Sequence, residues 1–225
     1  MSSISPEVFS FLSELAQNNN KPWFEGQKDR FKDYQNDFKA FVTEVKTGME
    51  KKDQIENSKV FRIYRDIRFS KDKTPYKSHF AASFSRLGAE RRGGYYLHLK
   101  PGESFLAVGF WNPNKEDILR IRKEFELDVS ELEEILAGKE LKQVWGDLQG
   151  EQLKTAPKGF DREHPNIEFL RYKQFIFTRK FSDKEVLKPS FSDEVVRSYE
   201  AIRPFFDYMS DVLTTNLNGE SLLGS

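Results

Sequence analysis

The sequence predicts a single α+β domain in which a mainly antiparallel sheet packs against amino- and carboxy-terminal helices. Apolar residues recur at helical spacing near both ends of the chain, whereas the spacing changes to two residues between positions 60 and 111. No repeat or linker-like stretch interrupts the chain, and 225 residues that include 21 Phe supply enough apolar surface for one core. We therefore expect residues 1–225 to form one domain, with a disordered tail at 219–225.

The amino-terminal part of the chain predicts two helices. Ser5 and Pro6 form a favourable helix start, and the apolar residues that follow recur at helical spacing until Asn18. A second helix is expected from near Pro22. It places six apolar residues on one stripe, which we assign to the core: Phe24, Phe31, Phe38, Phe41, Val42 and Val45.

Strands are expected in the middle of the chain. From Val60 to Phe69 the pattern alternates, and strict alternation would put Arg65 on the same face as four apolar residues. Further strands are predicted at 78–86, 94–100 and 104–111, the last two joined as a hairpin, and another at 174–179.

Helices separate and follow these strands. One is expected after Pro113, and another is predicted to begin with a capping box formed by Ser130 and Glu133 and to end at Gly138. The last helix carries apolar residues from Val195 to Leu213, and Pro204 should kink it.

Composition excludes several classes of protein. The absence of Cys removes disulfides, thiolate zinc sites, iron–sulfur ligation and cysteine nucleophiles, and it fits a reducing cytoplasm, where we expect the protein. The sequence has no apolar run of membrane-spanning length and no signal-peptide pattern at its start, so we expect no membrane association and no secretion by the usual route.

The zero net charge hides two segments of opposite sign. Between Lys59 and Lys100 there are eleven basic and three acidic residues, a local net charge of +8. Between Glu124 and Glu151 nine acidic residues meet two lysines, a net charge of −7. One surface should therefore attract anions and another should repel them.

The basic segment contains the leading candidates for ligand binding. Arginine side chains bind phosphate or carboxylate with two parallel hydrogen bonds, and neighbouring lysines add positive potential. The candidates are Arg62, Arg65, Arg68, Lys71, Lys73 and Lys77. The alternative is an internal network of ion pairs with Asp66, Asp72 and more distant acids.

Arg65 distinguishes these interpretations. On a regular strand its guanidinium would enter an apolar layer, where it needs a carboxylate, carbonyl groups or a ligand. We predict that it meets either a carboxylate from a distant segment, with the Asp161–His164 loop as the leading candidate, or an open pocket that accepts an anion.

Two further features can serve a ligand or the fold. Arg91 and Arg92 lie in a turn flanked by glycines, which suits either an anion-binding nest or a plain hairpin. Trp23 at a helix start can stack on a ligand or anchor the core.

Catalysis has weaker support, because the common nucleotide, protease and hydrolase motifs are absent. The three histidines are too far apart in the sequence for a metal signature, so we predict no metal site. Whether the protein uses a cofactor stays open. A hydrolase would need His164 or His79 to converge with a carboxylate such as Asp161 or Asp66.

Several segments together resemble a known family. They are Asn19 to Phe24 (NNKPWF), Arg65 to Lys77 (RDIRFSKDKTPYK), the strand from Gly94 leading to Pro101, Ile118 to Arg122 (ILRIR), and Lys154 to Pro165. In this order they resemble a bacterial and fungal family of conserved hypothetical proteins, domain of unknown function twenty-four sixty-one. The resemblance covers nearly the whole chain and implies a single domain, but it implies no activity, cofactor or catalytic residue.

These observations favour a protein that binds an anionic, phosphate-bearing ligand, either a small molecule or nucleic acid, through a basic sheet surface. A pI near 6.9 does not favour nucleic acid. One alternative is a hydrolase acting on a phosphorylated or nucleic-acid substrate. Another is an interaction protein that pairs its basic surface with an acidic one, including that of a second copy of itself. Whether the protein is an enzyme stays open.

Overall fold

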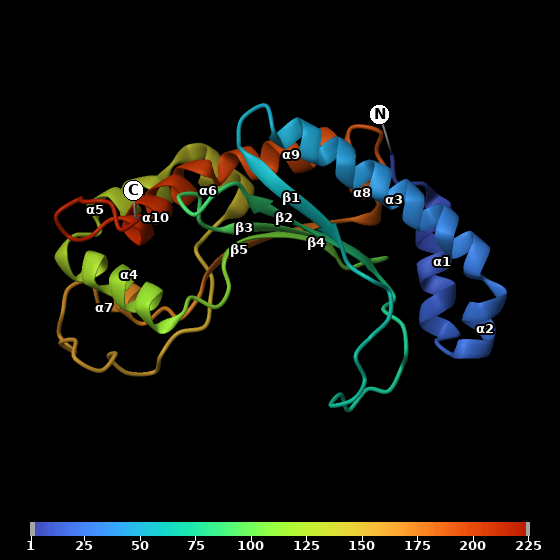
Figure 1. Cartoon of the computed structure of the whole chain (residues 1–225), viewed down its shortest axis with the longest axis horizontal. Coiled ribbons are helices and arrows are strands. Elements are labelled where there is room, and N and C mark those ends of the chain that lie inside the picture. Colours follow the sequence, from blue (N-terminus) through green and yellow to red (C-terminus); the bar gives the residue numbers. More distant parts are fainter. Residues whose placement is uncertain (1–2, 224–225) are drawn as a thin grey trace. The chain divides into compact units, whose positions relative to one another are not determined.

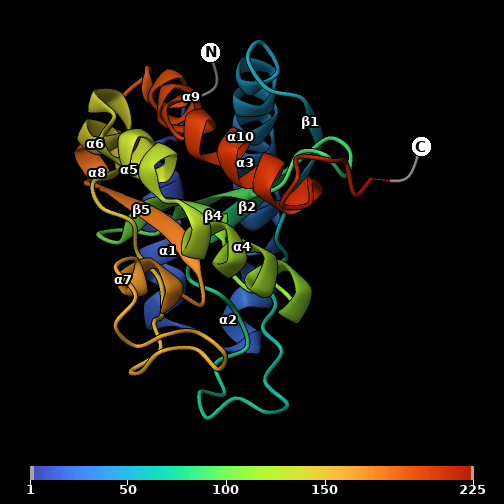
Figure 2. The ribbon, with the colours of Figure 1, turned by 90° about the vertical axis from the view of Figure 1, so that its left-hand side faces the viewer.

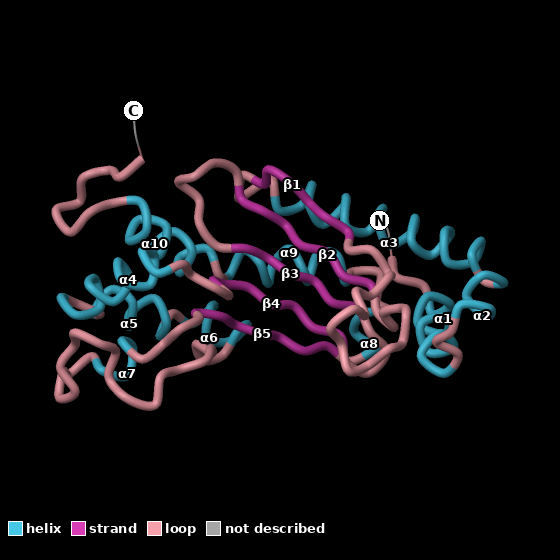
Figure 3. Tube along the Cα trace, turned by 60° about the horizontal axis from the view of Figure 1, so that its bottom comes forward, coloured by secondary structure: helices cyan, strands magenta, loops and turns pink. Residues whose placement is uncertain are grey.

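The computed structural model describes residues 3–223 and confirms the α+β class. One antiparallel sheet has the strand order β1-β2-β3-β4-β5, which follows the chain (Figure 1, Figure 3). The strands are β1 Ile55–Val60, β2 Phe80–Arg86, β3 Gly94–Leu99, β4 Ser104–Phe110 and β5 Phe175–Phe181. The predicted hairpin of β3 and β4 is confirmed, and so are the strands predicted at 78–86 and 174–179.

Helices precede, interrupt and follow the sheet in the sequence. They are α1 Pro6–Gln17, α2 Lys21–Gly26, α3 Lys28–Met49, α4 Lys115–Leu127, α5 Ser130–Ala137, α6 Lys139–Trp145, α7 Ile167–Leu170, α8 Asp183–Val186, α9 Phe191–Ala201 and α10 Arg203–Thr214. The expected helix from Pro22 is two helices that meet at Gln27. The expected kink near Pro204 is the break between α9 and α10.

Compact packing divides the chain into two units, each of which contains part of the sheet. The first comprises the described residues up to Phe84 together with Tyr96–Leu106 and Lys180–Arg197. The second comprises Ser85–Tyr95, Ala107–Arg179 and the described residues from Ser198 onward.

In the first unit, aromatic side chains join the helices to one face of the sheet. Phe38 of α3 stacks on Phe80 of β2 with the ring centroids 5.2 Å apart, and Phe191 packs against Phe41 of α3 and Phe181 of β5. The predicted apolar stripe of α2 and α3 is buried throughout, which confirms its place in the core. Successive residues of a strand point to opposite faces of the sheet. The residues next to Phe80 in the chain, such as His79, therefore face away from α3.

The second unit has its own aromatic core. Tyr95 of β3 packs against Tyr199 and Phe206, and Phe177 of β5 meets Phe205 edge to face. Gly109 of β4 allows the close approach to β5. Its φ is +135°, and a Cβ atom there would lie 2.1 Å from the carbonyl oxygen of Phe175.

The strand predicted from Val60 to Phe69 is wrong, because β1 ends at Val60. Residues 61–79, which we call the basic arm, form a long connection between β1 and β2 (Figure 2). The Phe61 N–H still donates to the Ala81 carbonyl, in the register of β1 and β2. The next bridge joins Tyr64 to Tyr76, which is shifted by two residues from that register. The pairing therefore leaves the sheet, and Phe69, predicted to share the apolar face, is 96% exposed.

The start of α5 and the carboxy-terminal tail also differ from the prediction. Ser130 is the first residue of α5 rather than its cap, and Asp128 accepts hydrogen bonds from the Ser130 backbone N–H and hydroxyl. A capping box is present instead at α8, between Ser182 and Glu185. In the predicted tail, the Leu222 N–H donates to the carbonyl of Thr214, and residues 224–225 lie outside the described residues.

Within residues 3–223, each helix is too short or too polar to cross a membrane.

Candidate anion-binding surface

The basic arm is held against the amino-terminal helices by one side-chain amide. The Asn19 carbonyl oxygen accepts from the Tyr76 N–H at 3.0 Å, and its amide donates to the Tyr76 carbonyl at 2.9 Å. Asn19 thus satisfies the hydrogen-bonding groups of the Tyr76 backbone, as the backbone of a neighbouring strand would. Phe24 adds a ring stack on Tyr76, with centroids 4.0 Å apart. The segments Asn19 to Phe24 and Arg65 to Lys77, both part of the family resemblance, therefore meet in space.

Arg65 finds its partner inside the arm. Its guanidinium contacts the carboxylate of Asp72 and the hydroxyl of Thr74. Both predicted partners, a carboxylate from a distant segment such as the Asp161–His164 loop and an open pocket, are wrong, because the chain turns back on itself after Arg65. The Arg65 hydrogen bond, with help from Thr74, lowers the pKa of Asp72 to about 2.

Other basic candidates are also paired with nearby groups. Arg68 makes a two-bond contact with Asp66, at 3.0 and 2.7 Å, and the Lys73 ammonium donates to the Ile67 carbonyl. Arg65 and Arg68 thus form ion pairs within the arm, with Asp72 and Asp66, as the alternative of an internal ion-pair network predicts.

The turn between β2 and β3 engages its arginines in the same way. Arg91 contacts Glu90, and Arg92 contacts Asp117 of α4. The guanidinium of Arg86 is almost fully buried and bonds to Asp207 and to the Arg92 carbonyl, which makes it part of the fold. These contacts favour the plain hairpin over an anion-binding nest. The ring centroids of Trp23 and the buried Phe11 of α1 are 6.0 Å apart, so Trp23 contacts the core.

A smaller group of cations forms no salt bridge among residues 3–223, although the charge of Arg62 helps to lower the pKa of Asp66. It comprises Lys59, Arg62, Lys71, Lys73 and Lys77. Burial, followed by the positive charges of Arg62 and Arg65, lowers the pKa of Lys77. Positive potential is therefore left uncompensated around Lys77.

Aromatic rings lie beside these cations on the sheet face that points away from α3. We call Phe61, His79, Tyr96, His98 and Phe105 the ring cluster. Ring centroids are 6.0 Å apart for Phe61 and Tyr96, 5.8 Å for Tyr96 and Phe105, and 4.1 Å for His79 and His98. His98 stacks on Phe105 at 4.7 Å. All five belong to the first unit, and four of them are partly exposed.

The cations and the ring cluster form one continuous surface. The ammonium groups of Lys59 and Lys77 lie 5.6 and 5.5 Å from the centroid of the Phe61 ring. Arg62 follows Phe61 directly in the chain and is exposed. Its charge helps to lower the pKa of Lys77, so three cations lie close to the Phe61 ring.

Both histidines of the ring cluster are neutral at pH 7. Burial, with smaller effects from His98 and Lys77, lowers the pKa of His79 to about 4. Burial also lowers the pKa of His98 to about 4, with a smaller effect from Lys100. The Tyr96 hydroxyl lies 3.1 Å from His98 Nδ1. The histidines therefore contribute flat, uncharged rings.

The residues weighed for catalysis do not form a His–carboxylate pair. His164 Nδ1 accepts from the Asn166 N–H, and Asp161 accepts from the Glu163 N–H, so both support turns of their own loop. Across residues 3–223 none of the three histidines contacts a carboxylate, and no three potential metal ligands gather. Asp66 is occupied by Arg68.

Sequence reasoning found Lys77, Arg62 and His79 but missed the other members of the ring cluster. A usable signal was present. The strands at 94–100 and 104–111 were expected, and alternation from the buried Leu97 places Tyr96 and His98 together on the opposite face. Phe105 joins them across the hairpin.

Comparison with known proteins gives one match. No curated protein and no solved structure matches the chain. The family model described as Conserved hypothetical protein (DUF2461) matches residues 7–208. This range includes the ring cluster and the whole basic arm, and it covers most of the sequence. The chain therefore belongs to this family of conserved hypothetical proteins.

Proposed function

We propose that this protein binds a phosphate-bearing ligand that also carries a planar ring, a nucleotide or a short single strand of nucleic acid. The observation that carries the proposal is the placement of Lys59, Arg62 and Lys77, which form no salt bridge among residues 3–223, beside the partly exposed ring of Phe61. We also propose that the protein acts in the cytoplasm, in keeping with the absence of Cys.

Each part of the surface suits one part of such a ligand. A base stacked on an aromatic side chain contributes about 1–3 kcal/mol, and this stacking tolerates any base. The arginine fork and the two ammonium groups suit phosphate oxygens. Because His79 and His98 are neutral at pH 7, they leave the ring surface free of additional charge.

The same geometry favours binding over hydrolysis. General acid–base catalysis needs a proton-transferring group that is oriented by a partner, and no histidine here contacts a carboxylate among the described residues. A chain of neutral rings beside unpaired cations is instead what sequence-tolerant binding of single strands requires.

Fluorescence anisotropy with a labelled oligothymidylate tests the proposal, with competition by AMP and inorganic phosphate. Three phosphate contacts predict a slope of about −2 in log K against log salt, because each contact to a single strand contributes about −0.7. The double variant Arg62→Gln/Lys77→Gln should weaken binding and reduce the slope to about −0.7. Phe61→Leu should weaken binding by roughly 5- to 100-fold with an unchanged slope.

Lys154→Gln/Lys158→Gln is the matched control, because it removes two exposed charges from the second unit. It should leave both affinity and slope close to those of the unaltered protein. Equal losses in the two double variants would contradict the proposal. Competition by inorganic phosphate as strong as by AMP would show that the rings have no role.

A further inference from the structure

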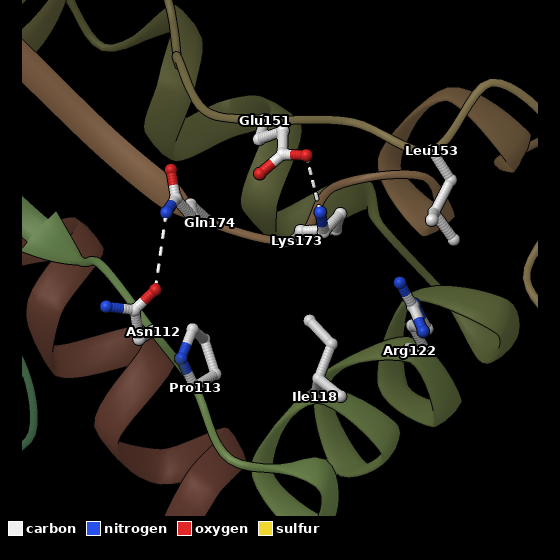
Figure 4. A pocket seen from close by; sticks show the side chains of 8 residues that line it. All are labelled: Asn112, Pro113, Ile118, Arg122, Glu151, Leu153, Lys173 and Gln174. Carbon is white, nitrogen blue, oxygen red and sulfur yellow. Dashed lines mark hydrogen bonds and ion pairs between the residues drawn. The ribbon is translucent and has the colours of Figure 1, made fainter.

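A separate cleft of about 370 Å³ lies within the second unit (Figure 4). This volume falls in the lower part of the roughly 300–1,000 Å³ range of small-molecule sites. Pro113, Ile118 and Leu153 supply apolar surface, and Asn112 and Gln174 place two hydrogen-bonded amides at one end. The cleft therefore combines a short apolar wall with polar groups.

Two cations line this cleft, and Arg122 of α4 is the one that forms no salt bridge among residues 3–223. Its Nε donates to the Leu170 carbonyl at 2.9 Å, and its Nη2 donates to the Tyr172 carbonyl at 3.3 Å. These two bonds fix the guanidinium plane and leave Nη1 without a hydrogen-bond partner among residues 3–223. No carboxylate of that part of the chain pairs with Arg122. Burial lowers its pKa, as expected for a cation held by carbonyl groups alone.

The net charge of the residues that line the cleft is +1 and comes from Arg122. Lys173 and Glu151 also line it, but they form an ion pair at 2.5 Å and neutralise each other (Figure 4). A single unpaired positive charge is best matched by a ligand with a single negative charge. A dianionic phosphate would bring one negative charge more than the cleft balances.

We propose that this cleft binds a small organic monocarboxylate. One carboxylate oxygen accepts from Arg122 Nη1, and the short apolar part of the ligand lies against Ile118 and Leu153. The amides of Asn112 and Gln174 can bond to a further oxygen of the ligand. Ile118 and Arg122 belong to the ILRIR segment of the family resemblance, which the proposed ring-cluster function does not use.

Titration calorimetry and saturation-transfer NMR with sodium butyrate test this inference, at constant ionic strength. Butyramide, which has the same shape without the charge, is the ligand control, and inorganic phosphate is the competing anion. Arg122→Gln removes the charge, whereas Leu153→Trp fills the cleft and keeps Arg122. Lys123→Gln is the matched protein control, because Lys123 is the neighbouring cation on α4 and pairs with Glu126.

The unaltered protein and Lys123→Gln should bind butyrate with equal affinity. Arg122→Gln should weaken butyrate binding by roughly tenfold or more, because a charge-assisted bond is lost. Leu153→Trp should abolish it, which keeps the test decisive if Arg122→Gln folds poorly. The inference is overturned if the unaltered protein does not bind butyrate, if both cleft variants bind it unchanged, or if butyramide or phosphate binds more tightly than butyrate.

Discussion

Replacing Asn19 by Ala should loosen the basic arm, because Asn19 makes both of its side-chain hydrogen bonds to the backbone of Tyr76. A typical hydrogen bond contributes about 1 kcal/mol, so two such bonds amount to about 2 kcal/mol. For a chain of this size, that loss corresponds to a fall in Tm of roughly 4–8 °C.

Urea unfolding and amide hydrogen exchange measure this effect globally and locally. The Tyr76 amide should exchange faster in Asn19→Ala, by about tenfold or more if its bond to Asn19 controls local opening. Asn18→Ala is the matched control, because the Asn18 side chain donates to the Glu14 carbonyl of its own helix and makes no bond to the arm among residues 3–223. An unchanged exchange rate at Tyr76, or equal effects of the two substitutions, would refute the role assigned to Asn19.

Three further outcomes are expected. Gly109→Ala should destabilise the protein by about 3 kcal/mol or more, seen as a lower urea midpoint, because its Cβ would lie 2.1 Å from the Phe175 carbonyl oxygen at a φ of +135°. Arg86→Met should cost about 2–3 kcal/mol in the same assay through the lost bonds to Asp207 and the Arg92 carbonyl; no loss would show that Arg86 is dispensable. The folded-state pKa of His98 is about 4 against an ordinary 6.5, so its stabilising contribution should be lost as pH falls from about 6.5 toward 4. Imidazole NMR should show this midpoint near 4, and a midpoint above 6 would contradict the burial of this ring.

Helices and the hairpin were predictable because their signals are local. The apolar stripe from Phe24 to Val45 has a clear helical period, and the strands on either side of Gly102 alternate around a short turn. These patterns do not depend on distant parts of the chain. The predicted classes of these elements therefore agree with the structure, although their ends differ by a few residues.

The basic arm shows where local pattern fails. Residues 60–69 alternate as a strand does, but the true edge strand, Ile55–Val60, is mostly polar and gives little signal. Beyond the shift of pairing the arm contacts a distant part of the chain, because Asn19 bonds to Tyr76 and Phe24 packs against Tyr64. A local pattern cannot show these contacts. The alternating pattern therefore places Arg65 in an apolar layer, whereas in the structure it bonds to Asp72.

An NMR measurement on the complex with a short oligothymidylate tests most directly whether one ligand is bound through both its phosphate and its ring at the ring cluster. We expect intermolecular contacts between thymine protons and the ring protons of Phe61, Tyr96 or Phe105, together with amide shifts at Arg62 and Lys77. In Phe61→Leu the contacts at position 61 should vanish, whereas those with Tyr96 and Phe105 should persist. Shifts confined to other parts of the chain, or amide shifts at Arg62 and Lys77 with no contact between base and ring protons, would contradict the claim that phosphate and ring are bound together at the ring cluster.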